Sequence, residues 1–352
     1  MSLAAALRAR IAEAGPITVG AFMAECLLHP KWGYYTTRDP LGTAGDFTTA
    51  PEISQMFGEL VGLALAQAWM DQGTPDAITL AELGPGRGTL MADILRATKA
   101  VPGFHAALEI HLVEASPALR EKQRAALAGH DITHHDSAGT LPEAPLFLIA
   151  NEFFDALPIR QFIRAGDAWR ERLVGLDDDT LAFGLGVPDM PAELAHRDDV
   201  AEGGLVETCP AAAAIMDQIA RRIGTHGGAA LIVDYGDWRS LGDTLQALKS
   251  HAPVDPLATP GEADLTAHVD FEALARAAPA LAASRLTPQG VFLERLGITP
   301  RAEALARRLS GTALDAHVAA HRRLTHPDEM GTLFKVLALV PPGAPMLPGL
   351  EP

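Results

Sequence analysis

The chain has 352 residues, of which 48% are hydrophobic and 20% are charged, enough to bury a large core in one elaborated domain or two. Its formal net charge of −16 opposes binding to nucleic acid or to anionic membranes, because both rest on basic side chains that neutralise phosphates. The apolar stretches fall short of the roughly 20 residues that cross a bilayer, so we expect no nucleic acid partner and no membrane insertion.

Residues 1–75 are predicted to form a mostly helical N-terminal cap. The first segment, "MSLAAALRARIAEAG", reads either as an organelle transit peptide or as a folded helix. Ser2 as a capping residue and Glu13 within the segment favour the helix. Apolar residues at helical spacing predict a second, long helix from Pro51 to Trp69.

Residues 76–158 are predicted to form a cofactor-binding βαβ half, beginning at "AELGPGRGTL" between a buried strand and an amphipathic helix. Gly84, Gly86 and Gly88 read G-x-G-x-G, whereas the dinucleotide fingerprint is G-x-G-x-x-G, which argues against NAD. Alternate glycines let the backbone approach a flat ligand, and Glu82 is placed to face an amino acid or a ribose. A turn shaped by packing alone is the alternative.

The next two predicted strands add candidates for an adenosine site. "LEIHLVEASP" ends a strand at Glu114, whose carboxylate is placed to accept both ribose hydroxyls. In "THHDSAGTLP", Asp136 and Ser137 follow a short strand. They either contact an adenine edge or only form a turn, since Asp and Ser are common turn residues.

Polar residues also end the buried strand in "APLFLIANEFFDALP". Asn151, Glu152 and Asp155 follow it at the carboxyl edge, where open α/β sheets bind ligands. Asp234 ends the strand "GAALIVDYG" in the same way. We expect these side chains to face a substrate; helix capping or backbone hydrogen bonding is the alternative role.

The rest of the chain predicts three further parts. Residues 159–210 alternate with turn signals and indicate a β-rich antiparallel insertion. Residues 211–342 resume the helix and strand pattern, with "SRLTPQGVFL" and "TLFKVLALV" as the two strands that complete the sheet, and residues 343–352 form an extended tail. The predicted fold class is α/β, with a Rossmann-like seven-stranded sheet.

Several long blocks of this sequence resemble the MidA family of class I S-adenosylmethionine-dependent methyltransferases, in colinear order from about residue 15 to about residue 340. The blocks are "GYYTTRDPLGTAGDFTTAPEISQMFGELVG", "AELGPGRGTL", "HLVEASP", "ANEFFDALP", "VDYG", "GEADLTAHVDF" and "MGTLFKV". The long blocks are far more specific than the glycine loop.

The resemblance implies a class I methyltransferase sheet and S-adenosylmethionine as cofactor. It also implies that the loop containing Asp46 and Thr48 serves as a lid over the cofactor, with a purely structural loop as the alternative. The mitochondrial member of the family is the complex I assembly factor that methylates an arginine of a core subunit. We therefore expect a protein substrate with an exposed arginine, such as a complex I subunit.

Methylation of arginine places demands on carboxylates. The guanidinium pKa lies above about 12, so a carboxylate must hold the group and lead its proton away. Glu152 and Asp155 are the candidate catalytic residues, followed by Asp234. A small-molecule methyltransferase and a non-catalytic assembly chaperone are the alternative functions, and both share the cofactor motifs.

The cysteines bear on the location of the protein and on metal binding. Cys26 and Cys209 lie far apart in the sequence and in no ligand-like spacing. Reduced thiols are the simple interpretation, so we expect a cytoplasmic location and no metal site.

Overall fold

The computed structural model describes residues 2–37, 49–250 and 252–352. By its internal contacts the chain divides into two compact units. Unit 1 consists of residues 1–47, 154–213 and 237–273, and unit 2 of residues 48–153, 214–236 and 274–352. The chain therefore passes from one unit to the other repeatedly, and each unit is assembled from distant segments.

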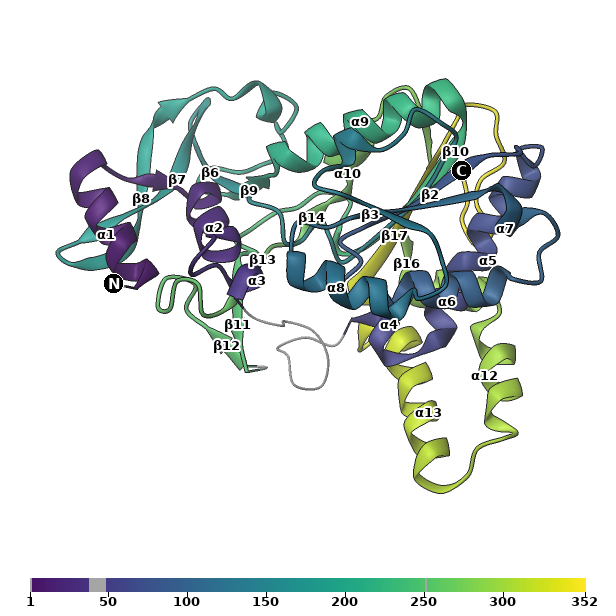
Figure 1. The fold of residues 1–352 in the computed structure, drawn as a ribbon. Helices are drawn as coiled ribbons and strands as arrows, with labels where there is room; N and C mark the ends of the chain where they lie inside the picture. Colours follow the sequence, from purple (N-terminus) through teal and green to yellow (C-terminus); the bar gives the residue numbers. More distant parts are fainter. Residues whose placement is uncertain (1, 38–48, 251) are drawn as a thin grey trace. The chain divides into compact units, whose positions relative to one another are not determined.

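Unit 2 is built around a mostly parallel sheet (Figure 1). Its strands are β2 (Ile78–Leu83), β3 (Leu108–Val113), β4 (Ile132–His135), β5 (Leu146–Asn151), β10 (Gly228–Asp237), β15 (Ala282–Ala283) and β17 (Phe334–Val340). They lie in the order β15-β17-β10-β5-β2-β3-β4, in which β17 is antiparallel to β10 and the strands from β10 to β4 are parallel. Every residue of β2 and β5 is buried, as in the centre of a parallel sheet, and most of these residues are apolar. The expected Rossmann-like α/β fold is confirmed, and these seven strands form the main path of its sheet.

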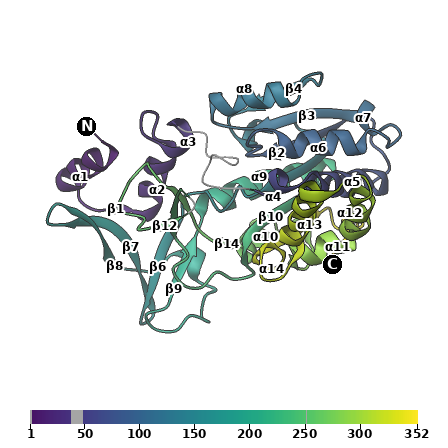
Figure 2. The same cartoon turned by 90° about the horizontal axis from the view of Figure 1, so that it is seen from below.

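Helices connect these strands (Figures 1 and 2). They are α4 (Ala50–Ile53), α5 (Gln55–Asp71), α6 (Thr89–Thr98), α7 (Phe104–Ala107), α8 (Pro117–Ala126), α9 (Pro210–His226), α11 (Gln289–Arg295), α12 (Ile298–Ala306), α13 (Gly311–Thr325) and α14 (Met330–Leu333). Helices α5 and α6 approach closely because Gly58 and Gly62 face α6. A Cβ atom on Gly62 would lie 2.9 Å from the Cα atom of Ile94.

The predicted helix from Pro51 to Trp69 is wrong in one respect, because it is broken at Ser54. Ser54 adopts an extended conformation that ends α4, and its hydroxyl accepts a hydrogen bond from the backbone nitrogen of Met56 at 3.3 Å to begin α5. The side chain of Thr49 makes no capping hydrogen bond to α4. A hydrogen bond from a nearby backbone nitrogen to a serine side chain competes with the hydrogen bonds of a continuous helix. At Ser54 the side-chain hydrogen bond forms and the helix is interrupted.

The predicted strand "SRLTPQGVFL" is also largely wrong. Thr287–Pro288 (β16) pairs with β17, as do the two residues of β15 just before this segment, but from Gln289 the chain continues as helix α11. Gln289, Phe292 and Leu293 are buried at i, i+3 and i+4, which is helical spacing. Gly290 allows the helix to pack tightly, since a Cβ atom there would lie 2.3 Å from the carbonyl oxygen of Thr325.

Unit 1 contains antiparallel sheets. Strands β1 (Ile17–Thr18), β6 (Arg160–Ala165), β7 (Ala168–Asp177), β8 (Thr180–Asp189) and β9 (Leu205–Thr208) form one sheet in the order β1-β7-β6-β9, with β8 beside β7. The antiparallel strands predicted for residues 159–210 are therefore present. A smaller sheet has the order β12-β11-β13, with β11 (Gln246–Lys249), β12 (Ala252–Val254) and β13 (Asp264–Thr266).

Helices α1 (Leu3–Ala14), α2 (Val19–Leu28) and α3 (Tyr34–Thr37) belong to the same unit. Ser2 caps α1 by accepting a hydrogen bond from the backbone nitrogen of Ala5 at 3.3 Å, so the segment is a helix as expected. The remaining short elements are β14 (Val269–Asp270) and α10 (Phe271–Arg276). The five segments expected from the sequence stay a prediction, and the two units divide the chain elsewhere. Helix α5, for example, lies in unit 2.

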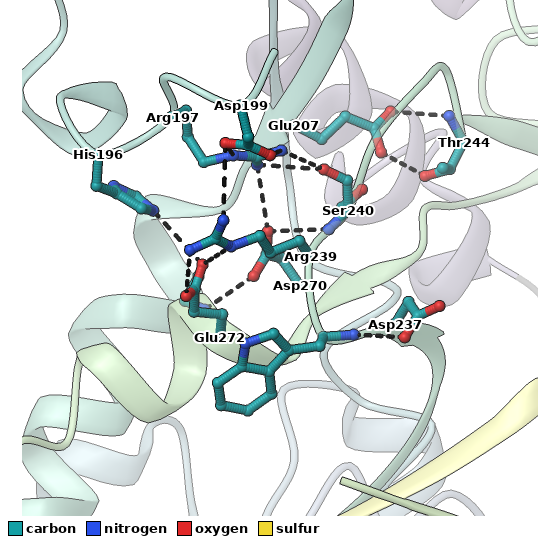
Figure 3. A network of polar contacts seen from close by, with 12 residues as sticks. His196, Arg197, Asp199, Glu207, Asp237, Arg239, Ser240, Thr244, Asp270 and Glu272 are labelled. Carbon is teal, nitrogen blue, oxygen red and sulfur yellow. Dashed lines mark hydrogen bonds and ion pairs between the residues drawn. The ribbon is translucent and has the colours of Figure 1, made fainter.

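A network of charged side chains holds the segments of unit 1 together (Figure 3). The Arg197 side chain is almost fully buried and donates to the carbonyl oxygen of Ser240 at 3.2 Å, while its Nε atom lies 3.0 Å from Asp199. Asp270 accepts a hydrogen bond from the backbone nitrogen of Ser240 at 3.1 Å, and burial raises the pKa of its carboxyl group. Arg239 pairs with Glu272 at 2.6 Å. The contact of Arg197 with Ser240 joins the segments 154–213 and 237–273, and the other contacts hold each segment in place beside it.

None of the helices in the described ranges combines the length and the apolar character that a membrane crossing requires.

Candidate functional site

The glycine loop lies in unit 2 between β2 and α6, as the sequence predicts. Gly84, Gly86 and Gly88 have φ angles of 60°, 54° and 86°, in the left-handed region that favours glycine. A Cβ atom on Gly84 would lie 2.9 Å from the Phe153 ring, and one on Gly88 would lie 3.4 Å from the Cα atom of Gln123. The backbone conformation therefore favours glycine at all three positions, and the Phe153 ring adds crowding at Gly84.

Glu82 ends the buried strand that leads into the loop. Its side chain is only 3% exposed, and its Oε2 atom has no hydrogen-bond partner among the described residues. Burial, and to a smaller extent the charge of Glu114, raises the pKa of this carboxyl group to about 8. An uncompensated buried oxygen costs free energy in the folded protein, which fits a group whose partner is a ligand.

Glu114 ends β3 as predicted. Its Oε1 atom accepts a hydrogen bond from the backbone nitrogen of Ser116 at 2.8 Å, and its Oε2 atom accepts one from Nε2 of Gln123 at 3.2 Å. Burial raises its pKa, although these hydrogen bonds favour the charged form and oppose the shift. The carboxylate is therefore held in one orientation at the carboxyl edge of the sheet.

Gln123 is a residue of this site that the sequence prediction missed. The amide nitrogen of this fully buried side chain also donates to the carbonyl oxygen of Gly86 at 2.8 Å. A signal was available: Leu119 and Leu127 are buried on the same face of the helix, so a glutamine between them at four-residue spacing interrupts an apolar stripe.

Asp136 and Ser137 follow β4. Asp136 is exposed and its Oδ1 atom lies 2.5 Å from Nη2 of Arg120. The same guanidinium donates to the backbone carbonyl oxygens of Glu114 and His135, and so connects the ends of two strands. Ser137 accepts a backbone hydrogen bond from Thr140 in a turn. The turn interpretation is thus present, and an adenine contact stays a prediction.

Asn151 and Glu152 lie at the end of β5. Glu152 has a φ angle of 52°, which is unusual for a residue with a side chain, and its Oε1 atom accepts hydrogen bonds from the backbone nitrogen of Ala50 at 3.1 Å and from Asn151 at 3.0 Å. One oxygen of Glu152 therefore serves in capping α4, the alternative role considered above. Asn151 Oδ1 is buried and has no partner within the described part of the chain.

Asp155 belongs to unit 1 and lies with Tyr35 and Asp264. Both carboxylates are buried, and the Tyr35 hydroxyl donates to Asp264 at 2.8 Å. Burial and the charges of Asp264 and Asp155 raise the pKa of Tyr35 well above its ordinary value of 10.0. Tyr35, Asp155 and Asp264 come from three separate sequence blocks of the family resemblance. The sequence prediction missed Tyr35 and Asp264, although both lie within those blocks.

The remaining candidates have simple positions. Asp234 is 1% exposed on β10, where its Oδ1 atom accepts a hydrogen bond from the backbone nitrogen of Tyr235 at 2.9 Å. Glu152 and Asp155 belong to different units, and their role as catalytic residues stays a prediction. Asp46 and Thr48 lie outside the described residues.

Comparison with known proteins shows relatives along almost the whole chain. The chain is 39% identical over 366 residues to the "Protein arginine methyltransferase NDUFAF7, mitochondrial" of Xenopus laevis. The alignment covers 94% of this chain and 83% of that protein. Identity to the human protein of the same name is 38% over 362 residues, covering 94% of this chain and 82% of the relative.

The chain is also similar to a protein of known structure. The crystal structure of a Burkholderia thailandensis protein bound to S-adenosyl-homocysteine superposes with a TM-score of 0.83 at 31% identity. The match covers 99% of this chain and 93% of that one.

The expectation of a cytoplasmic location is wrong by these comparisons, because the curated relatives carry the label mitochondrial. The physical basis of the expectation was weak, since two separated cysteines indicate only reduced thiols and do not distinguish one reducing compartment from another.

Residues 60–289 match the model of a family described as "Putative S-adenosyl-L-methionine-dependent methyltransferase". That match spans more than half of the chain and includes the glycine loop, Glu82, Glu114 and the end of β5. Together with the relatives, it shows that the chain belongs to this family of S-adenosylmethionine-dependent methyltransferases.

Proposed function

We propose that this chain methylates an arginine side chain of a protein substrate, with a subunit of respiratory complex I as the substrate. The observation that carries the proposal is the 39% identity, over 94% of the chain, to a protein named as a protein arginine methyltransferase. The complex I subunit is the finer part of the proposal and rests on the resemblance to the MidA family.

The residues of unit 2 fit a nucleoside methyl donor. The backbone of the glycine loop leaves no room for side chains at Gly84, Glu82 keeps a buried oxygen without a partner among the described residues, and Glu114 is held at the strand end. When bound, S-adenosylmethionine supplies a methyl group on a sulfonium, which transfers in line to a nucleophile. The protein therefore contributes mainly by holding the reacting groups at close distance.

An arginine nucleophile needs carboxylates for orientation and for removal of its proton. Asp155, Glu152 and Asp234 are the proposed catalytic residues. We give Asp155 the first place, because its charge and that of a second buried carboxylate, Asp264, both act on Tyr35, and because one oxygen of Glu152 already accepts two hydrogen bonds. Two neighbouring carboxylates suit a delocalised cation with several donors better than a neutral substrate.

Methyl transfer to arginine-containing peptides and to complex I subunits tests the proposal. Asp155→Asn keeps the shape of the side chain and removes its charge, so transfer should fall roughly a hundredfold, as when a group that stabilises the transition state is lost. The affinity for S-adenosylmethionine should stay within a few-fold. Asp179→Asn is the matched control, since Asp179 is exposed in the turn between β7 and β8.

Two outcomes would contradict parts of the proposal. Full turnover by both Asp155→Asn and Glu152→Gln would show that neither residue is catalytic, and Asp234 would then be the remaining candidate. Mass spectrometry of respiratory subunits from cells with and without this protein tests the substrate. Identical methylarginine content in both would exclude a complex I subunit, and cofactor binding without any transfer would favour a non-catalytic assembly role.

A further inference from the structure

The side chain of Gln123 connects three parts of the candidate cofactor site. From α8 its Nε2 atom donates to the carbonyl oxygen of Gly86 at 2.8 Å and to the Glu114 carboxylate at 3.2 Å. Its Oε1 atom lies 2.8 Å from Nε2 of His134 on β4. A single amide thus joins the glycine loop to the ends of two strands.

The chemistry of the three contacts permits one orientation of this amide. A primary amide carries two hydrogens on nitrogen and none on oxygen. Both partners of Nε2, the Gly86 carbonyl and the Glu114 carboxylate, are acceptors, so they use both hydrogens. The amide oxygen must then accept, so Nε2 of His134 carries a hydrogen. A rotated amide would place oxygen against two acceptors.

The position of the glutamine backbone is restricted as well. A Cβ atom on Gly88 would lie 3.4 Å from the Cα atom of Gln123, so α8 packs directly on the glycine loop. Ser116 caps the beginning of α8 by accepting a hydrogen bond from the backbone nitrogen of Leu119. Its own backbone nitrogen donates to Glu114, so the helix and the carboxylate are fixed to each other.

We propose that Gln123 is a positioning residue for the cofactor, which holds Glu114 and the Gly86 peptide in the geometry that receives the ribose, and that His134 sets the orientation of its amide. This inference rests on the proposed cofactor site of unit 2. Without the two donor hydrogens, Glu114 loses a restraint, and the backbone carbonyl of Gly86 loses this partner.

The test is calorimetric binding of S-adenosylhomocysteine to the full chain. Gln123→Met keeps the length of the side chain and removes all three hydrogen bonds, and we expect an affinity loss of about five- to twentyfold. Gln123→Glu retains the contact with His134 but sets a carboxylate against Glu114 and Gly86, so its loss of affinity should be larger. Gln67→Met, the same substitution at a glutamine of α5 whose side chain makes an exposed hydrogen bond to Asp71, is the matched control and should bind like the wild type.

A second readout separates positioning from a structural role. Binding of 5′-methylthioadenosine should weaken in Gln123→Met much more than binding of its 2′,3′-dideoxy analogue, because the lost restraint acts on the ribose contacts. Equal weakening of both ligands would overturn the positioning role. So would affinities within twofold of the wild type in both Gln123 variants.

If Gln123→Met fails to fold, His134→Leu supplies the test. It removes only the hydrogen bond that His134 donates to the amide oxygen of Gln123, and His134 is partly exposed. It should weaken S-adenosylhomocysteine binding two- to fivefold, and unchanged binding would count against the proposal. A wild-type protein that does not bind S-adenosylhomocysteine would instead overturn the cofactor site itself.

Discussion

The individual residues of the cofactor site are held in conformations that cost free energy without a ligand. Three glycines in the left-handed region, a Glu152 backbone with positive φ and a buried Glu82 oxygen without a partner among the described residues all occur at the carboxyl ends of β2 and β5. Such features concentrate at functional sites, where binding offsets their cost.

The Glu82 carboxyl group should link cofactor binding to pH. Its pKa is about 8 in the folded chain against an ordinary value of 4.5, so it is largely protonated at pH 7. The positive charge of S-adenosylmethionine should ionise it, so binding at pH 7 should release up to one proton. Calorimetry in buffers of different ionisation enthalpy measures this number, and Glu82→Gln should release fewer protons. Equal release by both proteins would contradict the assignment.

The same pKa shift has a consequence for the stability of the free protein. Folding favours the protonated carboxyl, so this contribution is fully present below about pH 4.5 and is lost as the pH rises to about 8. Glu82→Gln should therefore be more stable than the wild type above pH 8, despite weaker cofactor binding. A trade of stability against function is common for buried groups of binding sites.

Among the secondary structure elements, the contact of α5 with α6 positions the helix that follows the glycine loop. Gly58 and Gly62 lie one turn apart on α5 and allow this contact, and Glu59 between them joins Arg96 of α6 at 2.6 Å and Arg301 of α12 at 2.7 Å. Burial opposes ionisation of Glu59, but the two guanidinium groups outweigh it and lower the pKa. The small residues set the helix spacing, and the charges connect three helices.

Gly62→Ala should destabilise unit 2 by about 1–3 kcal/mol, because the added methyl would lie 2.9 Å from the Cα atom of Ile94. The higher helix propensity of alanine, about 1 kcal/mol, offsets only part of this cost. Gly224→Ala on α9 is the matched control, since its nearest neighbour would be 3.9 Å away, and it should be neutral or stabilising. Urea denaturation measures both; a Gly62→Ala variant as stable as the control would refute the packing argument.

Over the whole molecule, the cores of the two units are separate clusters. One cluster includes Leu80 and Phe147 around the main sheet, and another includes Phe22 and Val174 in unit 1. The residues assigned to the cofactor lie in unit 2, whereas Asp155 and its neighbours Tyr35 and Asp264 lie in unit 1. Cofactor binding is therefore expected to stabilise the two units unequally.

Hydrogen exchange checks this expectation. At a free S-adenosylhomocysteine concentration of about 100 times Kd, the ligand adds about 2.7 kcal/mol to the state that binds it. The slowest amides of β2 and β5 should then exchange about a hundredfold more slowly, and those of β6 and β9 should change much less. Equal slowing in all four strands would mean that the units unfold as one.

Much of the main sheet and part of the site could be predicted from the sequence. Runs of mostly apolar residues predict the strands β2, β3, β5, β10 and β17. Alternate glycines, Glu82 and Glu114 mark the ends of two of these strands. These signals are local: burial on both faces requires continuous apolar residues, and backbone with positive φ requires glycine. They predict the strand ends, where the candidate cofactor residues lie.

Other features depend on contacts between residues far apart in the chain. Gln123 has a role only because α8 brings it against the Gly86 carbonyl, and Tyr35 meets Asp264 across more than two hundred residues. Helix α11 replaces a predicted strand because Gly290 packs against Thr325. The periodicity of the sequence indicates which side of a helix or strand is buried. The tertiary structure determines which residues pack against that side, and the hydrogen bonds and close contacts depend on those residues.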